Sequence, residues 1–256
     1  MKKVLLLFGS AGNREVLCDS AVYLRDNFSF EIHPLYIKDI RREEVIPTSV
    51  EGVVLDPGNN VMVQEWETFE NEEIKEIRNI LFNKGINAKL SVEIGFIPDI
   101  VKEYMKISDL LLMSRTEYVS ENTISLLKNQ YKPLIMVGKN PLQLSKIGIS
   151  TDDGVKINKS TTSFLNMFPQ IESFTMLAWN YDSDENSLLE YLKDRDKEAT
   201  FNNFQGDMGK VEFYERIKQL DLLIMGNLSR SYFFEKITRR KGLNILENAQ
   251  TSIFIG

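Results

Sequence analysis

Small and basic residues follow the apolar run Leu222–Met225, and their types suit the binding of an anion. Gly226 comes directly after the run, and a glycine lets the backbone approach a phosphate without an intervening Cβ atom. Guanidinium groups also bind phosphate well. A solvated basic helix face is the alternative explanation for the residues that follow, which are Arg230, Arg239, Arg240 and Lys241.

A second candidate for phosphate chemistry is the glycine-containing turn Gly9–Asn13, which lies between an apolar run and an amphipathic segment. Many α/β folds bind phosphate at a turn between a strand and a helix. The turn lacks the lysine of a phosphate-binding P-loop and the third glycine of a dinucleotide fingerprint. A structural turn is therefore the favoured interpretation, and ligand contact is the alternative.

The residue types that most often carry catalysis or hold metals are scarce in this chain. His33 is its one histidine and Cys18 its one cysteine, and they fall in different predicted elements. One residue of each kind makes neither a zinc site nor a nucleophile and base pair. We expect no catalytic residue, no metal ligand, a buried structural thiol at Cys18 and a structural role for His33.

Composition narrows the class of protein. The 256 residues are 43% hydrophobic and 27% charged, as in a soluble globular protein, and the net charge of −6 disfavours binding to nucleic acid. A single cysteine suits a reducing compartment. The apolar run Val4–Phe8 is shorter than the roughly 7–15 residues of a signal-peptide core, and no window reaches the roughly 18 apolar residues of a membrane helix. We therefore expect a cytoplasmic protein without a membrane partner.

Short apolar runs alternate with longer amphipathic segments along the chain, a pattern typical of parallel strands joined by crossover helices. The fold class is therefore predicted to be α/β. Residues 38–64 have no clear period and predict a long irregular loop, for which an interface and a lid are alternative roles. In the first half the pattern predicts strands at 4–8, 30–37, 88–94, 109–113 and 133–137, and helices at 13–27, 67–84, 98–106 and 119–130.

The strand pattern of the first half recurs in the second. Asp221–Met225 is identical to Asp109–Met113 at four of five positions, and Lys146–Ser150 and Ser252–Ile255 repeat the first and last strands. Three matches in the same order favour a duplication. The sequence thus predicts two domains, 1–139 and 140–256, the second of them shortened where the polar stretch 194–210 suggests a missing helix.

The run Gly95–Tyr104 followed by Asp109–Met113 resembles the universal stress proteins. That family places a glycine after its third strand, opens a helix with a proline-type turn and begins its fourth strand with an aspartate. The resemblance covers nearly the whole chain as two consecutive copies. It implies two adenine nucleotide alpha hydrolase-like, Rossmann-like domains, each a mainly parallel five-stranded sheet with helices on both faces. They would pack as an intramolecular pseudo-dimer, with ligand sites at the carboxyl ends of the strands.

The nucleotide signature of that family follows the fourth strand as a glycine, a second glycine three residues on, nine further residues, and Gly-Ser or Gly-Thr. Laid on the second copy without gaps, these positions fall on Gly226, Ser229 and Arg239–Arg240. One signature position of four is kept, and two arginine side chains would fill the phosphate pocket. The resemblance therefore argues against standard ATP binding and leaves another anion as the alternative.

The family also places an aspartate beside the nucleotide at the end of the first strand. In the second copy this position falls on Asp152 or Asp153, and we choose Asp152, although an acidic turn explains the same residues. In the first copy Phe8 occupies the position, and no glycine occurs between Met113 and Gly138. The first site is therefore predicted to be lost.

Three functions follow from these observations, and the fold by itself does not choose among them. The first is a non-catalytic, stress-associated regulatory protein that acts through contacts with a protein partner. The second is a module that binds ATP, AMP or another small anion in the second domain only, and the third is a weak ATPase. Dimerisation of the tandem chain stays open. The candidate ligand-binding residues are Asp152, Gly226, Ser229, Arg230, Arg239 and Arg240.

Overall fold

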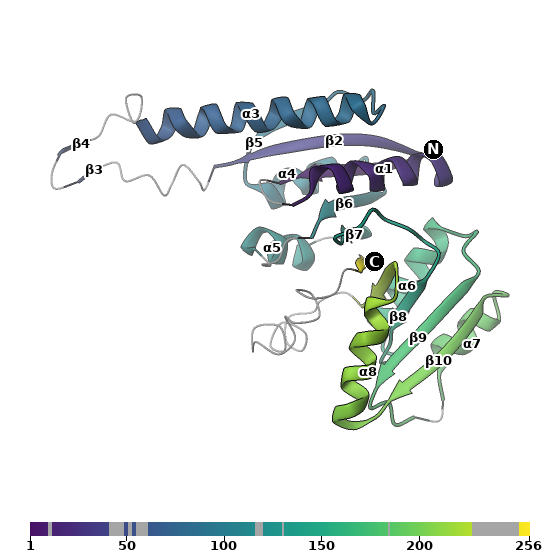
Figure 1. Cartoon of the computed structure of the whole chain (residues 1–256). Coiled ribbons are helices and arrows are strands. Elements are labelled where there is room, and N and C mark those ends of the chain that lie inside the picture. The colour runs from purple at the N-terminus through teal and green to yellow at the C-terminus, as the bar shows by residue number, and fades with distance from the viewer. Residues whose placement is uncertain are drawn as a thin grey trace.

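One ten-stranded sheet with helices on both faces forms the body of the molecule (Figure 1). The strand order is β10-β9-β8-β11-β12-β7-β6-β1-β2-β5, so the predicted α/β class is confirmed. The computed structural model describes residues 1–9, 12–40, 49–50, 53–54, 61–115, 120–129, 131–183, 185–226 and 251–256.

The first half of the chain forms five strands of this sheet, and all four pairings among them are parallel. The strands are β1 (Lys2–Phe8), β2 (Phe30–Asp39), β5 (Ser91–Gly95), β6 (Leu110–Ser114) and β7 (Leu134–Val137). The helices are α1 (Arg14–Phe28), α3 (Val61–Asn83), α4 (Ile97–Tyr104) and α5 (Glu121–Asn129). A two-stranded hairpin, β3 (Ser49–Val50) with β4 (Val53–Val54), lies between β2 and α3 in the chain.

The second half repeats this arrangement. Its strands are β8 (Ile147–Ser150), β9 (Ser173–Trp179), β10 (Glu198–Phe204), β11 (Leu222–Met225) and β12 (Ser252–Ile255). Its described helices are α6 (Val155–Met167), α7 (Ser187–Lys193) and α8 (Gly206–Lys218). If the five strands of each half are numbered along the chain, their order from the middle of the sheet outward is fifth, fourth, first, second, third in both halves.

The two halves of the sheet meet through β7 and β12, the one antiparallel pairing among the described strands of this sheet. Ile253 lies opposite Met136, and Phe254 lies opposite Ile135. Leu134 and Ile253 hold the same place in the two halves, because Leu134 pairs with Leu111 as Ile253 pairs with Leu223, 112 residues further on (223 − 111). Met136 corresponds in the same way to Ile255, which pairs with Leu134. The pairing is therefore the same when the halves are exchanged, as in an isologous contact between two copies.

Apolar residues on successive strand positions explain why this sheet is covered on both faces. Val4 and Leu6 of β1 pack into the layer beneath α1, α3, α6 and α7, whereas Leu5 and Leu7 pack into the layer beneath α4, α5 and α8. A strand that is buried on both sides must be apolar at every position, because its side chains alternate between the faces.

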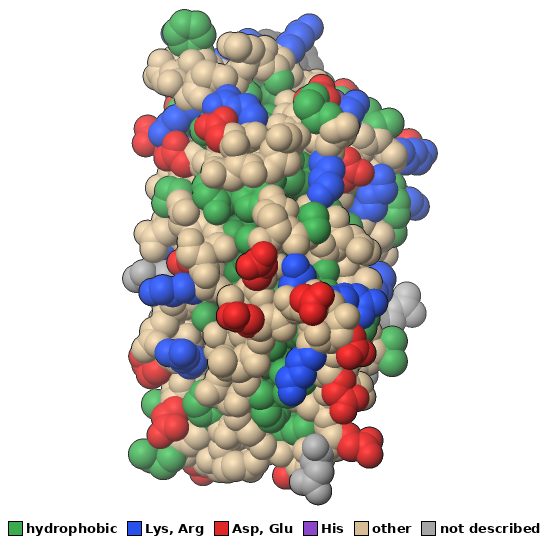
Figure 2. Space-filling view, turned by 90° about the vertical axis from the view of Figure 1, so that its right-hand side faces the viewer, with side chains coloured by type: hydrophobic (Ala, Val, Ile, Leu, Met, Phe, Trp, Pro, Cys, Tyr) green, Lys and Arg blue, Asp and Glu red, His purple; other side chains and the backbone are tan. Residues whose placement is uncertain are grey.

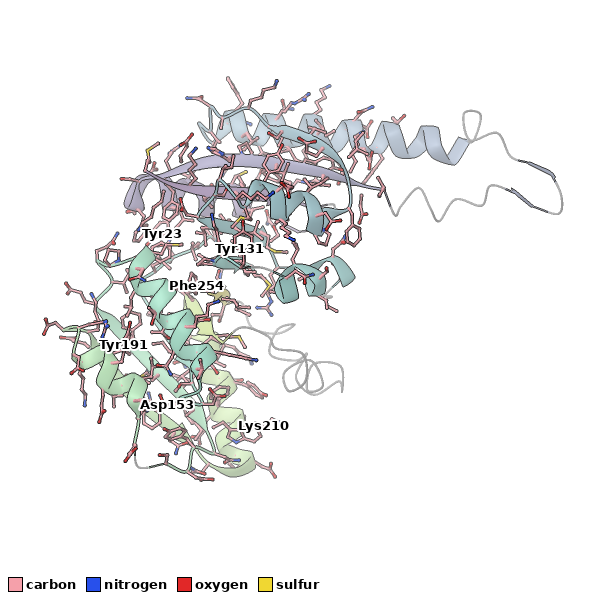
Figure 3. All side chains as sticks on the ribbon, turned by 180° about the vertical axis from the view of Figure 1, so that it is seen from behind. Tyr23, Tyr131, Asp153, Tyr191, Lys210 and Phe254 are labelled. Atoms are coloured by element: carbon pink, nitrogen blue, oxygen red, sulfur yellow. The ribbon has the colours of Figure 1, made fainter. Side chains whose placement is uncertain are left out.

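Aromatic rings fill the first of these layers near the junction of the halves. Phe168 contacts Phe28 and Phe30 of the first half at centroid distances of 5.1 and 6.0 Å. Phe164 packs edge-to-face on Phe254 of β12 at 5.2 Å, and Figure 3 labels Phe254 close to this junction. Such ring pairs add about 0.5–1.5 kcal/mol each beyond their buried area, so this cluster binds the two halves together.

The prediction of a missing helix in the second half is wrong. The second-to-third strand connection contains α7, which has 7 residues where α3 has 23. The polar stretch 194–210 contains strand β10 and the start of α8. β10 lies at the edge of the sheet, so much of its surface is exposed, and an exposed strand carries polar residues without the apolar run expected of a buried strand.

The charged surface has no single sign on the face that Figure 2 shows, where Lys and Arg side chains are interspersed with Asp and Glu. In the part of the chain that the structure describes, no helix is long and apolar enough to cross a membrane.

Candidate functional site

The carboxyl ends of β8 and β11 meet the start of α6 in the second half, where the sequence predicts the ligand site. Gly226 follows β11 and lies against the first turn of α6. A Cβ atom at this position would stand 3.1 Å from both the backbone nitrogen of Ile157 and the Cβ of Lys156. These contacts are tight, so Gly226 is favoured here by close packing of backbone on backbone.

The start of α6 carries no side-chain cap. Its N-cap residue is Gly154, which has no side chain to accept a hydrogen bond from the first amides of the helix. The first amides of a helix have no partner within the helix, and together with the helix dipole they favour an anion. The second half therefore keeps the backbone features of an anion site beside Gly226.

Asp152 and Asp153 both hold the turn that precedes α6. An oxygen of the exposed Asp152 side chain accepts a hydrogen bond from the Gly154 backbone at 3.0 Å, so Asp152 forms the acidic turn that the sequence left as an alternative. The Asp153 carboxylate accepts hydrogen bonds from the backbone nitrogens of Ser187 and Leu188, both at 2.8 Å. Asp153 thereby binds the first two amides of α7, and the N-cap residue Asn186 accepts a hydrogen bond from the third, that of Leu189.

In the first half the end of a strand also packs closely on the segment before a helix, but here the glycine belongs to the segment before the helix. Ser114 ends β6 and corresponds to Gly226 at the offset of 112 (226 − 114). It packs against Gly12, where a Cβ atom would stand 2.5 Å from the Cβ of Ser114. Gly12 also has a φ of +114°, which favours glycine on its own. Packing and backbone conformation thus explain why Gly12 of the Gly9–Asn13 turn is a glycine.

Strand register identifies the first-half position that corresponds to Asp152. Val4 pairs with Leu110 as Ile147 pairs with Leu222, which relates β1 to β8 by an offset of 143 (147 − 4). Gly9, and not Phe8 as expected from the sequence, is therefore the counterpart of Asp152 (152 − 143). Neither Gly9 nor Phe8 has a carboxylate, so the expected loss of this group stands.

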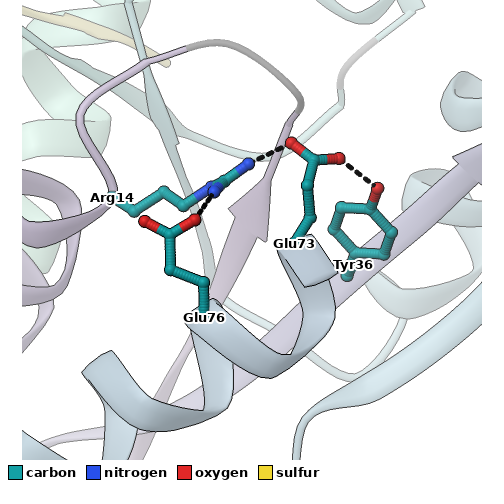
Figure 4. A network of polar contacts seen from close by, with 4 residues as sticks. All are labelled: Arg14, Tyr36, Glu73 and Glu76. Atoms are coloured by element: carbon teal, nitrogen blue, oxygen red, sulfur yellow. Dashed lines mark hydrogen bonds and ion pairs between the residues drawn. The ribbon is translucent and has the colours of Figure 1, made fainter. Parts of the chain in front are cut away.

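The start of α1 is occupied by its own side chains, unlike the start of α6. The Asn13 side chain accepts a hydrogen bond from the Val16 backbone nitrogen at 3.1 Å and caps the helix. Arg14 forms ion pairs with Glu73 and Glu76 of α3. Glu73 also accepts a hydrogen bond at 2.8 Å from the buried Tyr36 hydroxyl (Figure 4). These bonds tie α1 to α3 and β2.

A cavity of about 760 Å³ lies beside this network. Its charged lining consists of Arg14 and four carboxylates, those of Glu15, Glu72, Glu73 and Glu76. A phosphate would meet a net negative lining here, which repels it. The charge of this cavity therefore disfavours a phosphate group in it.

The sequence predicts structural roles for Cys18 and His33, and the surroundings of both residues agree with such roles. Cys18 is fully buried, and burial raises the pKa of its thiol to about 12. The His33 ring lies 2.9 Å from a carboxylate oxygen of Glu31 on the same strand. Among the described residues no group of three or more His, Cys, Asp or Glu side chains is arranged to hold a metal ion.

Several candidate residues lie outside the described part of the chain. They are Ser10 and Ala11 of the first turn, and Ser229, Arg230, Arg239, Arg240 and Lys241 of the second half. Of the six predicted ligand-binding residues, the structure therefore places Asp152 and Gly226, both at the start of α6. Sequence reasoning missed the cap at Asn13 and the Arg14 network. An asparagine before a helical pattern is a recognisable capping signal, whereas the partners of Arg14 lie too far along the chain to be inferred.

Comparison with known proteins identifies the class of fold. The chain is similar to a universal stress protein from Archaeoglobus fulgidus DSM 4304, with a TM-score of 0.68 and 11% identity over 98% of this chain and 94% of the other. It is also similar to a functionally unknown protein from Pseudomonas aeruginosa PAO1, with a TM-score of 0.54 and 9% identity over 99% and 92% of the two chains. No protein-family model and no curated protein matches the sequence. The chain thus has the universal stress protein fold over nearly its whole length.

Proposed function

We propose that this chain is a cytoplasmic universal stress protein of non-catalytic type, which regulates through contacts with a protein partner and whose first nucleotide site is lost. The observation that carries the proposal is the network of Arg14, Glu73 and Tyr36 beside the start of α1. The Asn13 cap adds to it by using one of the helix amides. Side chains of the protein itself thus bond to the Arg14 guanidinium and the Val16 amide, two groups at this helix start that could bind a phosphate.

The chemistry of Cys18 and of the described acidic residues supports a function by binding. Catalysis by a nucleophile needs an adjacent base, and metal-assisted hydrolysis needs a cluster of ligands. Cys18 is buried with a raised pKa, and no group of metal-ligating side chains occurs in the described ranges. We therefore infer that the protein works by binding, with its two halves arranged as an intramolecular pseudo-dimer about the β7 and β12 pairing.

The second candidate function is binding of ATP, AMP or another small anion in the second half. It is favoured by one contrast between the halves, because α6 begins at an uncapped glycine whereas α1 begins at the capping residue Asn13. Gly226 and Lys156 lie at that point. Ser229, Arg230, Arg239 and Arg240 would complete this site, and weak ATPase activity would be its catalytic extension.

Isothermal titration of the purified chain with ATP, AMP and inorganic phosphate separates the two candidates. The first predicts no saturable heat that depends on Gly226 with any of the three ligands. Micromolar binding of ATP or AMP that Gly226→Ala abolishes would instead establish the second candidate, because the added Cβ stands 3.1 Å from the Ile157 nitrogen. The matched control is Ser114→Ala at the corresponding position of the first half, and circular dichroism of each variant verifies its folding.

A further inference from the structure

A cavity of about 670 Å³ lies at the amino ends of β8, β9 and β10, on the edge of the sheet opposite to Gly226. The first residues of these strands line it, namely Ile147, Ser173 and Glu198, and the ends of α7 and α8 complete its wall. Its volume falls within the roughly 300–1,000 Å³ typical of small-molecule sites. Neither of the functions proposed above uses this region.

Positive charge dominates the lining of this cavity. Four of its residues are cationic and one, Glu198, is acidic, so the formal charge of the lining is +3 (4 − 1). The whole chain carries −6, so the cavity is a local exception to the overall charge. The four cationic residues are Lys146, Lys193, Lys197 and Arg216.

Two of these cations are held in place by neutral groups. Lys197 donates a hydrogen bond to the Pro169 carbonyl at 2.8 Å, and Arg216 donates one to the Gln219 side-chain oxygen at 2.8 Å. A carbonyl and an amide position a cation without neutralising its charge. Nothing in the described ranges forms an ion pair with Lys146 or Lys193, and both are exposed residues.

The remaining lining combines apolar and hydrogen-bonding surface. Ile147, Phe174 and Leu220 are buried at 2%, 4% and 8% exposure, and they supply an apolar floor. Three residues with hydroxyl groups, Ser145, Thr175 and Thr200, are also among those that line the cavity. An apolar floor with a few polar groups is the usual composition of a small-molecule site.

The favourable position of cations at helix ends explains only part of the positive charge that lines the cavity. Lys193 and Arg216 lie in the last turns of α7 and α8, where cations offset the partial negative charge of the helix. Lys146 precedes β8 and Lys197 lies beyond the end of α7, so neither belongs to a last helical turn. The convergence of all four on one cavity therefore needs a further reason.

We propose that this cavity binds a compact organic polyanion, a molecule with at least two carboxylate or phosphate charges and a small apolar body. Its charges would contact Lys146, Lys193, Lys197 and Arg216, and its body would rest on Phe174 and Leu220. The site lies at the opposite edge of the sheet from the Gly226 site, so the two can be occupied independently.

Titration of the chain with citrate and with inorganic pyrophosphate at constant ionic strength tests the proposal, with sodium chloride as the reference salt. We expect saturable binding of at least one probe and amide chemical-shift changes at residues 145–147, 173–175 and 197–200. The double variant Lys146→Gln/Lys193→Gln should weaken binding at least tenfold. The control is Lys89→Gln/Lys102→Gln, which removes the same charge from two exposed positions of the first half and should leave the affinity unchanged.

Three results would overturn the site. One is the absence of saturable binding by the parent chain, in which case a loss of stability in Lys146→Gln/Lys193→Gln would show that the two lysines serve only the folded structure. Another is an equal loss of affinity in the two double variants, which would mean a diffuse response to net charge. The third is loss of probe binding in Gly226→Ala with the cavity lysines intact, which would move the probe to the other edge of the sheet.

Discussion

Glu73 is a buried carboxylate whose two oxygens have different partners, the Arg14 guanidinium and the Tyr36 hydroxyl. Its side chain is 5% exposed, and Arg14 is 16% exposed. Removing one member of a buried ion pair leaves the other without compensation. We therefore predict that Glu73→Ala lowers the free energy of unfolding by about 3–5 kcal/mol, as measured by urea denaturation.

Glu76 provides the matched control for that prediction, because it pairs with the same arginine but is 59% exposed. Glu76→Ala should cost less than about 0.5 kcal/mol, as expected of an exposed ion pair. Equal effects of the two substitutions would show that the network stabilises α1 and α3 only through charge on the surface.

Cys18 gives a prediction in alkaline solution. Burial raises the pKa of its thiol in the folded state to about 12, so the folded chain holds this proton at pH values where an unfolded chain releases it. The stabilisation is fully present below the ordinary thiol pKa and is lost as the pH rises toward 12. We expect almost no reaction of folded protein with a thiol reagent at pH 9 and rapid reaction in urea. Rapid labelling of the folded chain at pH 9 would contradict this burial.

The burial of Cys18 could be predicted from the sequence, because it sits on the apolar face of a helical pattern. The roles of Glu73 and Asp153 could not. Glu73 looks like one more charged residue on an acidic helix, and its burial depends on Arg14 at a separation of 59 residues. The partners of Asp153 lie 34 and 35 residues further along the chain. Contacts of this kind leave no local pattern in a single sequence.

Helix α7 has only 7 residues, so its stability depends on partners outside the helix. Asp153 accepts hydrogen bonds from its first two amides. We predict that Asp153→Ala costs about 1–2 kcal/mol and speeds hydrogen exchange at Ser187 and Leu188. Amide exchange measured by NMR reports both residues directly.

Asp196 offers a control for the backbone strain in that experiment. Asp153 and Asp196 both have a positive φ, of 53° and 56°, so alanine is strained at either position. Asp196 follows the end of α7, where its backbone nitrogen donates a hydrogen bond to the Lys193 carbonyl. Asp196→Ala should therefore share the strain while the hydrogen bonds from the first two amides of α7 to Asp153 stay intact. If exchange at Ser187 were the same in both variants, the cap would contribute nothing.

The elements themselves were largely predictable where they were apolar or strongly periodic. β1, β6 and β11 follow from uninterrupted apolar runs, and α1 follows from its helical period. β10 was missed because an edge strand need not be apolar, and α7 because seven residues are too few to show a clear period. The start of α3 at Val61 lies in a stretch that the sequence left as loop.

The whole molecule is predicted to unfold as one unit. The β7 and β12 pairing makes the sheet continuous, and both apolar layers extend across the two halves. The chain has two tryptophans, Trp66 on α3 and Trp179 on β9, so each half carries its own fluorescent probe. We expect Trp66→Phe and Trp179→Phe to give coincident transitions when each is followed by fluorescence and by circular dichroism. Two separated transitions in either variant would mean that the halves fold independently.

The order in which the strands are synthesised matters for this architecture. β12 is the last described strand along the chain, yet it lies in the middle of the sheet between β11 and β7. During translation, the apolar edge of β7 waits for its partner while about 115 further residues (252 − 137) are made, roughly 6–23 s at typical ribosome speeds. Over that interval the nascent chain presents an unpaired strand to its neighbours. We therefore expect the β7 edge to be the place where a ribosome-bound chain can pair with another chain.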